Sequence, residues 1–417
     1  MEIRRAIYLD KLIRKKKNGL IKVITGVRRC GKSYLLFYLF HKHLLDSGVP
    51  ENHIIEVALD DRSNKALRDP DAMLRFIKEN IRDKEDYYII LDEVQYLNEF
   101  EDVLNSLLHI RNADVYVTGS NSKFLSSDVI TQFRGRGDEI HVYPLSFSEY
   151  VPAYQGSVDE AWDDYLIYGG MPLILTMAEP EDKAAYLNSL FQKVYISDIV
   201  ERHDVRNKVE LDELVDILAS AIGSYTNQSK LVRTFKSVKG KTISDKTIKN
   251  YIDYLIDSFL ISKAVRYDIK GKKYIGSPSK YYFEDVGLRN ARLGFRQVEQ
   301  THLMENIIYN ELRIRRYHVD VGVVEYYGVN GEGKRGKKQL EVDFVATKGS
   351  EKHYIQSAFT LPTADKVDQE QRSLLHIPDS FRKIVVVGDN IKVRRDENGI
   401  ITIGLRNFLL DEDSLRL

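Results

Sequence analysis

Lys32 and Ser33 close a glycine-bounded loop whose residue types and spacing are those of a phosphate-binding site. Residues 22–33 read KVITGVRRCGKS, an apolar strand that runs into the pattern G-x-x-x-x-G-K-S. The glycines let successive backbone N–H groups face one point, so that Lys32 can reach the β- and γ-phosphates and Ser33 can ligate Mg²⁺. A plain glycine turn between a strand and a helix is the alternative. The expected nucleotide-binding residues are Gly26, Val27, Arg28, Arg29, Cys30, Gly31, Lys32, Ser33 and Tyr34.

Asp92 and Glu93 supply the carboxylates that such a site needs. They end the run 87–93, YYIILDE, which is typical of a buried parallel strand. In P-loop ATPases the strand beside the loop delivers an Asp to the Mg²⁺ shell, and often a neighbouring Glu that polarises the attacking water. Asp92 is therefore expected to hold the metal with Ser33, and Glu93 to activate water. An acidic strand end at the protein surface is the alternative.

A second polar strand end follows at 114–121, DVYVTGSN. This is where such ATPases place a polar side chain that senses the γ-phosphate, and Thr118, Ser120 and Asn121 are the candidates. The sequence does not choose among them, because a Gly-Ser-Asn turn would explain each residue by itself.

Arg134 and Arg136 lie in the loop QFRGRG, before an expected strand at 140–143. An arginine finger, which stabilises charge in the transition state of phosphoryl transfer, would belong in this loop. Exposed, solvated arginines fit the loop equally well.

The apolar spacing predicts the elements that must position these residues. A helix from about 33 to 44 would point its N-terminal dipole at the phosphates. A short amphipathic helix near 7–13 would precede the first strand. Beyond the loop helix, the pattern predicts a strand at 54–58 and helices around 70–81 and 100–108.

Five motifs occur in order along the chain: GVRRCGKS, YIILDEVQ, YVTGSNS, QFRGRGDEIHVYPLSFSEY and YLIYGGMP. Together they resemble the archaeal and bacterial AAA+ ATPases that carry a C-terminal domain of unknown function, and the resemblance covers nearly the whole chain. It implies an α/β protein with a P-loop AAA+ core and a parallel sheet, followed by a winged-helix part and a C-terminal α/β part similar to restriction-endonuclease-type nucleases. The expected domains are the AAA+ core at 1–154, a helical lid at 155–206, a basic winged-helix-like domain at 207–285 and a nuclease-like domain at 286–417.

The helical lid is expected to close over the nucleotide, and residues 165–172 and 195–200 are its recognisable parts. Gly169 and Gly170 would allow a tight turn within it. A plain helix-loop-helix linker is the alternative.

The middle of the chain is basic. Apolar spacing within 211–255 predicts three short helices that suit a helix-turn-helix, with Ser244 as N-cap of the third, and strands at 260–267 and 272–283 would form a wing. Between Lys230 and Lys280, thirteen basic residues stand against four acids, as binding to a phosphate backbone requires. A protein-interaction module with a lysine-solvated surface is the alternative. The residues expected to contact double-stranded DNA are Lys230, Arg233, Lys246, Lys249, Lys272 and Lys273.

The C-terminal domain contains only part of a nuclease site. The fold that it resembles holds a divalent metal with a helix Glu, a strand Asp and an acid-x-Lys on the next strand. Glu305 and Asp343 match the first two, but Gln356 and Ala358 stand where the acid and the lysine belong. A neutral amide is a poorer ligand for a hard cation than a carboxylate, and alanine cannot orient water, so an inactive domain is expected. The alternative is a lysine that has migrated into this role, the nearest in sequence being Lys348 and Lys352.

The composition is that of an ordinary globular protein with room for two or three domains. The 417 residues carry 62 basic and 62 acidic side chains, and 43% are hydrophobic. No apolar run approaches the ~20 residues of a membrane span, and the N-terminus lacks the apolar core of a signal peptide. The single cysteine, Cys30, agrees with a reducing compartment. A cytoplasmic location is therefore expected.

These observations predict an AAA+ ATPase that binds ATP with Mg²⁺ and couples its hydrolysis to DNA or protein binding by the C-terminal domains. A homo-oligomer that supplies an arginine across the subunit boundary is part of this expectation. Two alternatives stay open: a nucleotide-dependent protein-interaction switch with little turnover, and an active metal-dependent DNA nuclease.

Overall fold

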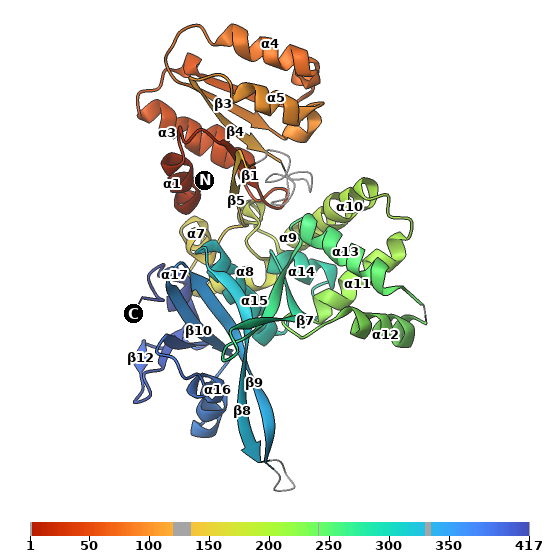
Figure 1. The fold of residues 1–417 in the computed structure, drawn as a ribbon, viewed down its shortest axis with the longest axis vertical. Coiled ribbons are helices and arrows are strands. Elements are labelled where there is room, and N and C mark those ends of the chain that lie inside the picture. Colours follow the sequence, from red (N-terminus) through yellow and green to blue (C-terminus); the bar gives the residue numbers. More distant parts are fainter. Residues whose placement is uncertain (1, 120–134, 241, 330–334, 417) are drawn as a thin grey trace. The chain divides into compact units, whose positions relative to one another are not determined.

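The computed structural model describes residues 2–119, 135–240, 242–329 and 335–416 (Figure 1). They form two compact units. The first comprises Met1–Pro144 together with Asp257–Phe259, and the second comprises Leu145–Ile256 together with Leu260–Leu417. Each unit is built around a β-sheet of its own, so the chain is an α/β protein with two separate cores.

Five parallel strands form the sheet of the first unit, in the order β2-β3-β4-β1-β5. Because all strands run in the same direction, β1, β3 and β4 end at the same edge of the sheet. The P-loop follows β1 there, Asp92 is the last residue of β3, and Thr118 is the last residue of β4. Contrary to the expectation from sequence, the strand that ends in Asp92 is not the direct neighbour of the strand that leads into the P-loop, since β4 lies between them. The strands are β1 (Ile21–Thr25), β2 (Ile54–Ala58), β3 (Tyr87–Asp92), β4 (Ala113–Thr118) and β5 (Gly137–His141).

The helices of this unit confirm the predictions made from apolar spacing. The helix after the P-loop is a continuous run whose middle part is π-helical. Helix α4 begins at Pro70, and Asp69 is its N-cap. The Asp69 Oδ1 accepts a hydrogen bond of 2.9 Å from the backbone N of Ala72. The elements are α1 (Ala6–Arg14), α2 (Lys32–Tyr34), η1 (Leu35–Phe40), α3 (His41–Asp46), η2 (Glu51–His53), η3 (Arg62–Arg68), α4 (Pro70–Asn80), η4 (Val94–Tyr96) and α5 (Phe100–Leu107).

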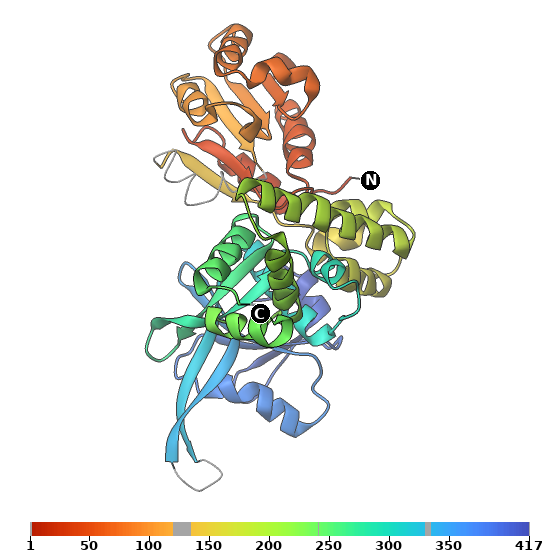
Figure 2. The same ribbon diagram turned by 90° about the vertical axis from the view of Figure 1, so that its right-hand side faces the viewer.

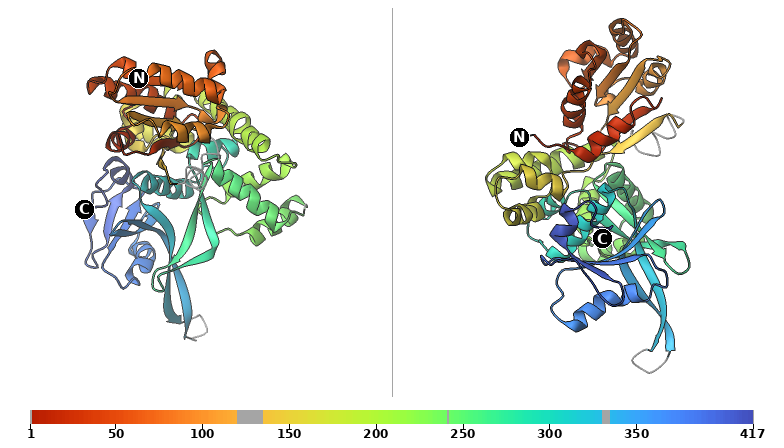
Figure 3. Two further views of the ribbon diagram at one scale, coloured as in Figure 1. Left: turned by 45° about the horizontal axis from the view of Figure 1, so that its top comes forward. Right: turned by 90° about the vertical axis from the view of Figure 1, so that its left-hand side faces the viewer.

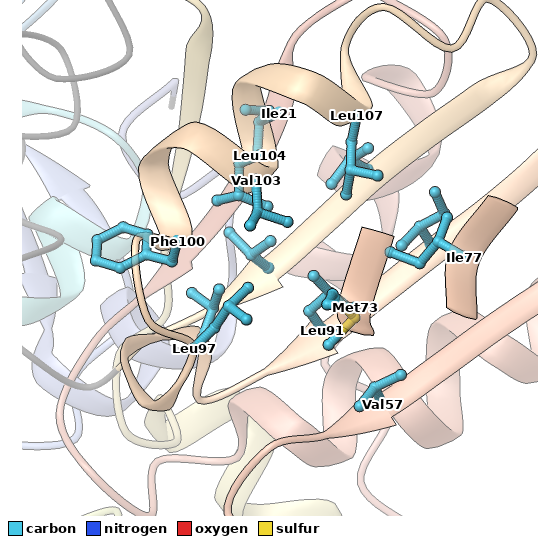
Figure 4. Packing of buried hydrophobic residues seen from close by; sticks show 14 of the residues in the cluster. Ile21, Val57, Met73, Ile77, Leu91, Leu97, Phe100, Val103, Leu104 and Leu107 are labelled. Carbon is cyan, nitrogen blue, oxygen red and sulfur yellow. The ribbon is translucent and has the colours of Figure 1, made fainter. Parts of the chain in front are cut away.

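The core of the first unit lies between the sheet and the helices α4 and α5 (Figure 4). Met73 and Ile77 of α4, and Leu104 and Leu107 of α5, are fully buried in one cluster with Leu91 of β3. Each such side chain stabilises the fold by roughly 1.5–3 kcal/mol through burial. This packing holds β3 in place and therefore the carboxylates at its end.

Eight strands form the sheet of the second unit, in the order β12-β13-β11-β10-β9-β8-β6-β7. The sheet is mixed: β6–β8, β10–β11 and β11–β13 pair in parallel and the other pairs are antiparallel. The longest strands, β8 and β9, project beyond the others as a hairpin (Figure 2 and Figure 3). The strands are β6 (Ile261–Asp268), β7 (Lys273–Phe283), β8 (His318–Val329), β9 (Arg335–Lys348), β10 (Glu351–Ala358), β11 (Arg382–Val387), β12 (Arg394–Arg395) and β13 (Ile401–Gly404).

The helices of the second unit precede the sheet and lie between its strands in sequence. Three of them, α11, α12 and α13, are the helices expected within 211–255, and the Ser244 hydroxyl accepts a hydrogen bond of 3.0 Å from Thr247 N as the expected N-cap. The elements are α7 (Phe147–Tyr150), η6 (Val151–Ala153), α8 (Val158–Tyr168), η7 (Pro172–Thr176), α9 (Pro180–Leu190), η8 (Phe191–Ile196), α10 (Ser197–Arg202), α11 (Lys208–Ser220), α12 (Gln228–Lys239), α13 (Asp245–Asp257), α14 (Val286–Arg292), α15 (Gln300–Ile314), α16 (Ala364–Leu375) and α17 (Leu405–Leu410).

The expected wing strands, β6 and β7, belong to the same sheet as the strands of residues 286–417. Residues 266–268 of β6 pair in parallel with 321–323 of β8, and β7 pairs with β6. The proposed boundary at 285 therefore divides the sequence but not the sheet.

The motif YLIYGGMP packs on α14 within the second unit. Asp285 is buried, and its carboxylate accepts hydrogen bonds from Gly170 N at 2.7 Å and Leu288 N at 2.9 Å. Gly169 has a φ of 72°, and a Cβ there would lie 2.4 Å from Asp285 Oδ1. Burial raises the pKa of Asp285 to about 6. Contact with this carboxylate therefore requires a glycine at 169, and close contact with Leu145 O, 2.2 Å from a Cβ, requires one at 170. The role of 155–206 as a lid over nucleotide stays a prediction.

Candidate functional site

The P-loop follows β1 with the backbone that its sequence predicts. Gly26 has a φ of 135°, and a Cβ there would lie 2.1 Å from the carbonyl oxygen of Val142, so no other residue fits without movement of the chain. Lys32 is buried, and its ammonium donates hydrogen bonds to the loop's own carbonyls, Gly26 O at 3.1 Å and Val27 O at 3.0 Å. The ammonium is therefore held inside the loop by two neutral acceptors.

The N-terminal segment and the chain after β5 brace the loop from behind. The Arg5 guanidinium, almost completely buried, donates to Cys30 O at 3.0 Å and to Tyr143 O at 2.6 Å. The Cys30 thiol, also buried, donates to Val142 O at 3.2 Å. Arg5 was missed from sequence, because an arginine in a basic N-terminal stretch gives no signal that distinguishes it from a surface charge.

The outer part of the loop is open to solvent. Arg29 and Ser33 are exposed, and Arg28 is half-buried. Arg29 adopts a φ of 62°, which is uncommon for a residue with a Cβ. Tyr34 stacks on Tyr38 with ring centroids 5.1 Å apart. The predicted nucleotide-binding residues thus form one continuous segment, the loop and the first turn of the helix after it. Lys32 is buried within this segment, and Ser33 is exposed.

Asp92 and Glu93 lie at the end of β3 and are tied together by Thr118 at the end of β4. The Thr118 hydroxyl donates a hydrogen bond to Asp92 Oδ1 and accepts one of 3.0 Å from Glu93 N. Burial raises the pKa of the Asp92 carboxyl, although hydrogen bonds with Thr118 and Ser33 act in the opposite direction. Glu93 has a φ of 49°, and its carboxylate accepts a hydrogen bond from Gln95. The Ser33 hydroxyl and the Asp92 carboxylate therefore lie within hydrogen-bonding reach of each other, and their role as ligands of one metal stays a prediction.

The remaining sensor and finger candidates are only partly placed. Thr118 is completely buried and both functions of its hydroxyl are used inside the protein, which suits positioning of the carboxylates better than contact with a phosphate. Ser120, Asn121 and Arg134 lie outside the described residues. Arg136 is exposed, just before β5.

The predicted DNA-contacting residues lie on α12, on α13 and at the β6–β7 turn of the second unit. All six are exposed, but three other basic residues between 230 and 280 have partners within the protein, and of these three Lys280 is buried. Arg266 donates to Gln339, Lys270 donates to Glu325 O at 2.7 Å, and Lys280 is buried. The positive surface is therefore smaller than the count of charges suggests.

Lys280, on β7, lies in the middle of three carboxylates. Its ammonium is 2.9 Å from Glu305 Oε1, 2.6 Å from Glu341 Oε1 and 4.0 Å from Asp343 Oδ1. Burial alone would lower the pKa of Lys280, but Glu305, Asp343 and Glu341 raise it above its ordinary value. Burial, reinforced by Glu305, raises the pKa of Asp343 well above its usual range. These four residues are called the Lys280 cluster below.

The antiparallel pairing of β10 with β9 determines where Gln356 and Ala358 lie relative to Asp343. Gln356 lies next to Asp343, whose backbone N donates to Gln356 Oε1 at 3.4 Å, and Ala358 is buried in the apolar core. The two lysines offered as alternatives for this role lie elsewhere, since Lys348 donates to Arg315 O at 3.1 Å and Lys352 lies over the ring of Phe381. The lysine at the carboxylates is Lys280, which the sequence places among the basic residues of the predicted DNA-binding region.

Two family models match different parts of the chain, and the end of the first match and the start of the second lie near the boundary between the two units. A family model for an AAA domain matches residues 18–151, which contain the five-stranded sheet, the P-loop and Asp92. A second model, for a domain of unknown function (DUF8612), matches residues 159–299, from α8 to the start of α15. The first unit is therefore an AAA domain with a nucleotide-binding fold.

Relatives extend the likeness to the whole chain. An uncharacterized protein of Haemophilus influenzae is 33% identical over 414 residues, which are 98% of this chain and 98% of the relative. The chain therefore belongs to the same family as this Haemophilus influenzae protein. An uncharacterized protein of Methanocaldococcus jannaschii is 28% identical over 389 residues, 89% of this chain and 81% of that protein.

Solved structures give a weaker likeness. The Aeropyrum pernix ORC1 protein in complex with DNA matches 70% of this chain and 93% of its own at 12% identity, with a TM-score of 0.28. AMPPCP-bound DnaA from Aquifex aeolicus matches 60% and 86% at 13% identity, also with a TM-score of 0.28. Scores this low carry no functional argument.

Two further features concern the described part of the chain as a whole. Among the described residues, no helix is long and apolar enough to cross a membrane. In the same part of the chain, no group of three or more His, Cys, Asp or Glu side chains is arranged to hold a metal ion.

Proposed function

We propose that this protein is an ATPase that binds ATP with Mg²⁺ and couples its hydrolysis to the binding of DNA or a protein partner by the second unit. The observation that carries the proposal is the Asp92–Glu93 pair at the end of β3, where the Thr118 hydroxyl binds the Asp92 carboxylate and the Glu93 backbone N at the sheet edge where the P-loop begins. A P-loop alone would support binding. A neighbouring Asp and Glu held rigidly by a third side chain support hydrolysis as well.

The residues present fit Mg²⁺–ATP. The Ser33 hydroxyl and the Asp92 carboxylate are oxygen ligands of the kind that Mg²⁺ prefers. The Lys32 ammonium can exchange the carbonyls of Gly26 and Val27 for phosphate oxygens, which are stronger acceptors because they are charged. When bound, Mg²⁺ would neutralise charge that develops on the phosphates.

Glu93 would act as the base that orients and deprotonates the attacking water. Its backbone N is held by Thr118, and its carboxylate accepts a hydrogen bond from Gln95, so both ends of the residue are oriented. Arg134, Arg136, Ser120 and Asn121 are retained as candidates for charge stabilisation and sensing, with the arginine supplied within a homo-oligomer.

Glu93→Gln tests this assignment. We expect the variant to bind ATP as the wild type does and to lose turnover by about 10²–10⁴-fold, the usual contribution of a general base. Binding is measured with a fluorescent ATP analogue and turnover by phosphate release, with Glu79→Gln on the exposed face of α4 as the matched control. Hydrolysis by Glu93→Gln at the wild-type rate would show that Glu93 is not the base.

A nucleotide-dependent interaction switch with little turnover remains the second candidate. It is favoured by the exposed basic residues on α12 and α13, which need no hydrolysis to bind a partner. Turnover measured against protein concentration separates the two: a rate per molecule that rises with concentration supports an arginine supplied by a second copy, and no turnover at any concentration supports the switch.

A further inference from the structure

The nuclease-like fold that the C-terminal half resembles implies a divalent cation between a helix Glu and a strand Asp. Glu305 on α15 and Asp343 on β9 do lie together, and Glu341, two residues before Asp343, joins them. Three carboxylates at one place can hold either a metal ion or a positively charged side chain.

The distances are those of an ammonium group. Lys280 Nζ lies 2.9 Å from Glu305 Oε1 and 2.6 Å from Glu341 Oε1, which are lengths of charged hydrogen bonds. Mg²⁺ requires oxygens at about 2.0–2.1 Å and Ca²⁺ at about 2.3–2.6 Å, six or more of them. Lys280 is 4% exposed, so the ammonium is enclosed. Glu305 and Asp343 are buried with it, and the Glu341 side chain is partly exposed.

The carboxylate oxygens also have other donors. Tyr282 OH donates to Glu305 Oε1 at 2.6 Å, the same oxygen that Lys280 contacts. Ser357 N donates to Asp343 Oδ2 at 2.8 Å. A cation would have to compete with these hydrogen bonds for lone pairs as well as displace the ammonium.

The position that would add a third strong ligand is neutral and occupied. Gln356 Oε1 accepts hydrogen bonds from Asp343 N at 3.4 Å and from the Ser373 hydroxyl at 3.3 Å. The amide carries no charge to offer a cation, and its oxygen joins β10 to β9 and α16 through these two hydrogen bonds. The residues present therefore do not fit the metal that the fold implies.

We infer that Lys280 is a built-in cation that takes the place of the divalent metal and closes the Lys280 cluster to metal ions. The cluster then joins β7, α15 and β9 as a permanent network of ion pairs. The C-terminal half would therefore bind its partner without cleaving DNA. This inference does not depend on ATP binding by the first unit.

Mn²⁺ titration of the nucleotide-free full-length chain, followed by the electron paramagnetic resonance signal of free Mn²⁺, tests the inference. The wild type and the Glu341→Gln variant should bind the same amount of Mn²⁺, because the Lys280 cluster is expected to bind none. Lys280→Met keeps the length of the side chain and removes its charge, so it should gain one equivalent of bound Mn²⁺. The double variant Lys280→Met with Asp343→Asn should lose that equivalent, and Lys263→Met, at an exposed position on the neighbouring strand β6, should behave as the wild type.

Two results would overturn the inference. One is binding of Mn²⁺ by the wild type that is lost in the Glu341→Gln variant. This measurement leaves Lys280 unchanged, so it tests the inference even if the Lys280→Met variant does not fold. The other is a Lys280→Met protein with native circular dichroism that binds no additional Mn²⁺. Plasmid and single-stranded DNA should also stay intact with wild-type protein and Mn²⁺, and cutting that disappears in Asp343→Ala would equally contradict the closed site.

Discussion

Lys32 and Lys280 are equally buried, at 4% exposure each, but their partners differ. The Lys32 ammonium is held by two backbone carbonyls of its own loop, and the Lys280 ammonium by carboxylates from α15 and β9. Neutral acceptors can be exchanged for the charged oxygens of a ligand, whereas carboxylates hold the ammonium more strongly than most ligands would. The difference separates a lysine suited to grip a ligand from one suited to hold the fold together.

Lys280→Ala should produce the largest effect on stability. Removing one partner of a buried ion pair leaves uncompensated charge, which costs about 3–5 kcal/mol of the free energy of unfolding. Urea denaturation measures this loss, with Lys263→Ala on β6 as the exposed control, for which we expect a change within about 0.5 kcal/mol. A Lys280→Ala protein as stable as the control would mean that the carboxylates are satisfied without the ammonium.

Lys32→Ala should weaken ATP binding while leaving the fold largely intact. Hydrogen bonds to charged groups contribute about 1.5–3 kcal/mol each, so removing one hydrogen bond to a phosphate oxygen should lower the affinity for ATP by roughly 10–150-fold. Binding of a fluorescent ATP analogue measures this decrease, and Lys78→Ala on the exposed face of α4 is the control. The comparison of the two lysines fails if Lys32→Ala destabilises the protein as much as Lys280→Ala does.

The two lysines also differ in how far the sequence predicts them. Lys32 belongs to a motif within eight consecutive residues, and Asp92 and Glu93 end an apolar strand, so local spacing identifies all three. Lys280 meets Glu305 across 25 residues, and Arg5 reaches Tyr143 across 138. Such contacts depend on which strands pair and in what register, which no local pattern in this sequence specifies.

The same limit applies to the fold. The main helices and strands of the first unit were predicted because apolar spacing is a local signal, although β5 spans Gly137–His141 and not the expected 140–143. The place of β4 between β1 and β3, and the joining of β6 to β8, result from packing of whole elements. Thr118 shows both sides: its position at a polar strand end was predicted, but its hydrogen bonds to Asp92 and Glu93 depend on that strand order.

The exposed lysines of the second unit are expected to behave unlike Lys280. Lys246 and Lys249 on α13 are exposed, so reversing both to Glu should spare stability and weaken binding to duplex DNA. Removal of one lysine–phosphate interaction lowers the slope of log affinity against log salt by about 0.9, so the double variant should have a slope flatter by about 2. Fluorescence anisotropy of a labelled duplex over a salt series measures both quantities.

The control for that experiment carries the same change of charge elsewhere. Lys193→Glu with Lys392→Glu alters two exposed lysines that lie outside the predicted DNA-contacting set, and it should bind as the wild type does. Equal weakening by both double variants would indicate a general effect of net charge. No binding by the wild type at low salt would favour a protein partner for this surface.

Thr118→Val should produce the smallest effect and the most specific one. The two side chains have the same shape, so the change removes only the hydroxyl that contacts Asp92 and Glu93 N. Of the two hydrogen bonds lost, only the one to Asp92 reaches a carboxylate. A loss of about 1–1.5 kcal/mol from that bond corresponds to roughly a tenfold fall in kcat, because the Asp92 carboxylate is less well oriented while Lys32 still binds the nucleotide. KM for ATP should stay within about twofold, and Thr118→Ser, which keeps the hydroxyl, should recover most of the rate. A purely structural role for Thr118 would instead lower the melting temperature and leave kcat of the folded protein unchanged, and a rise in KM without a fall in kcat would place the hydroxyl in nucleotide binding.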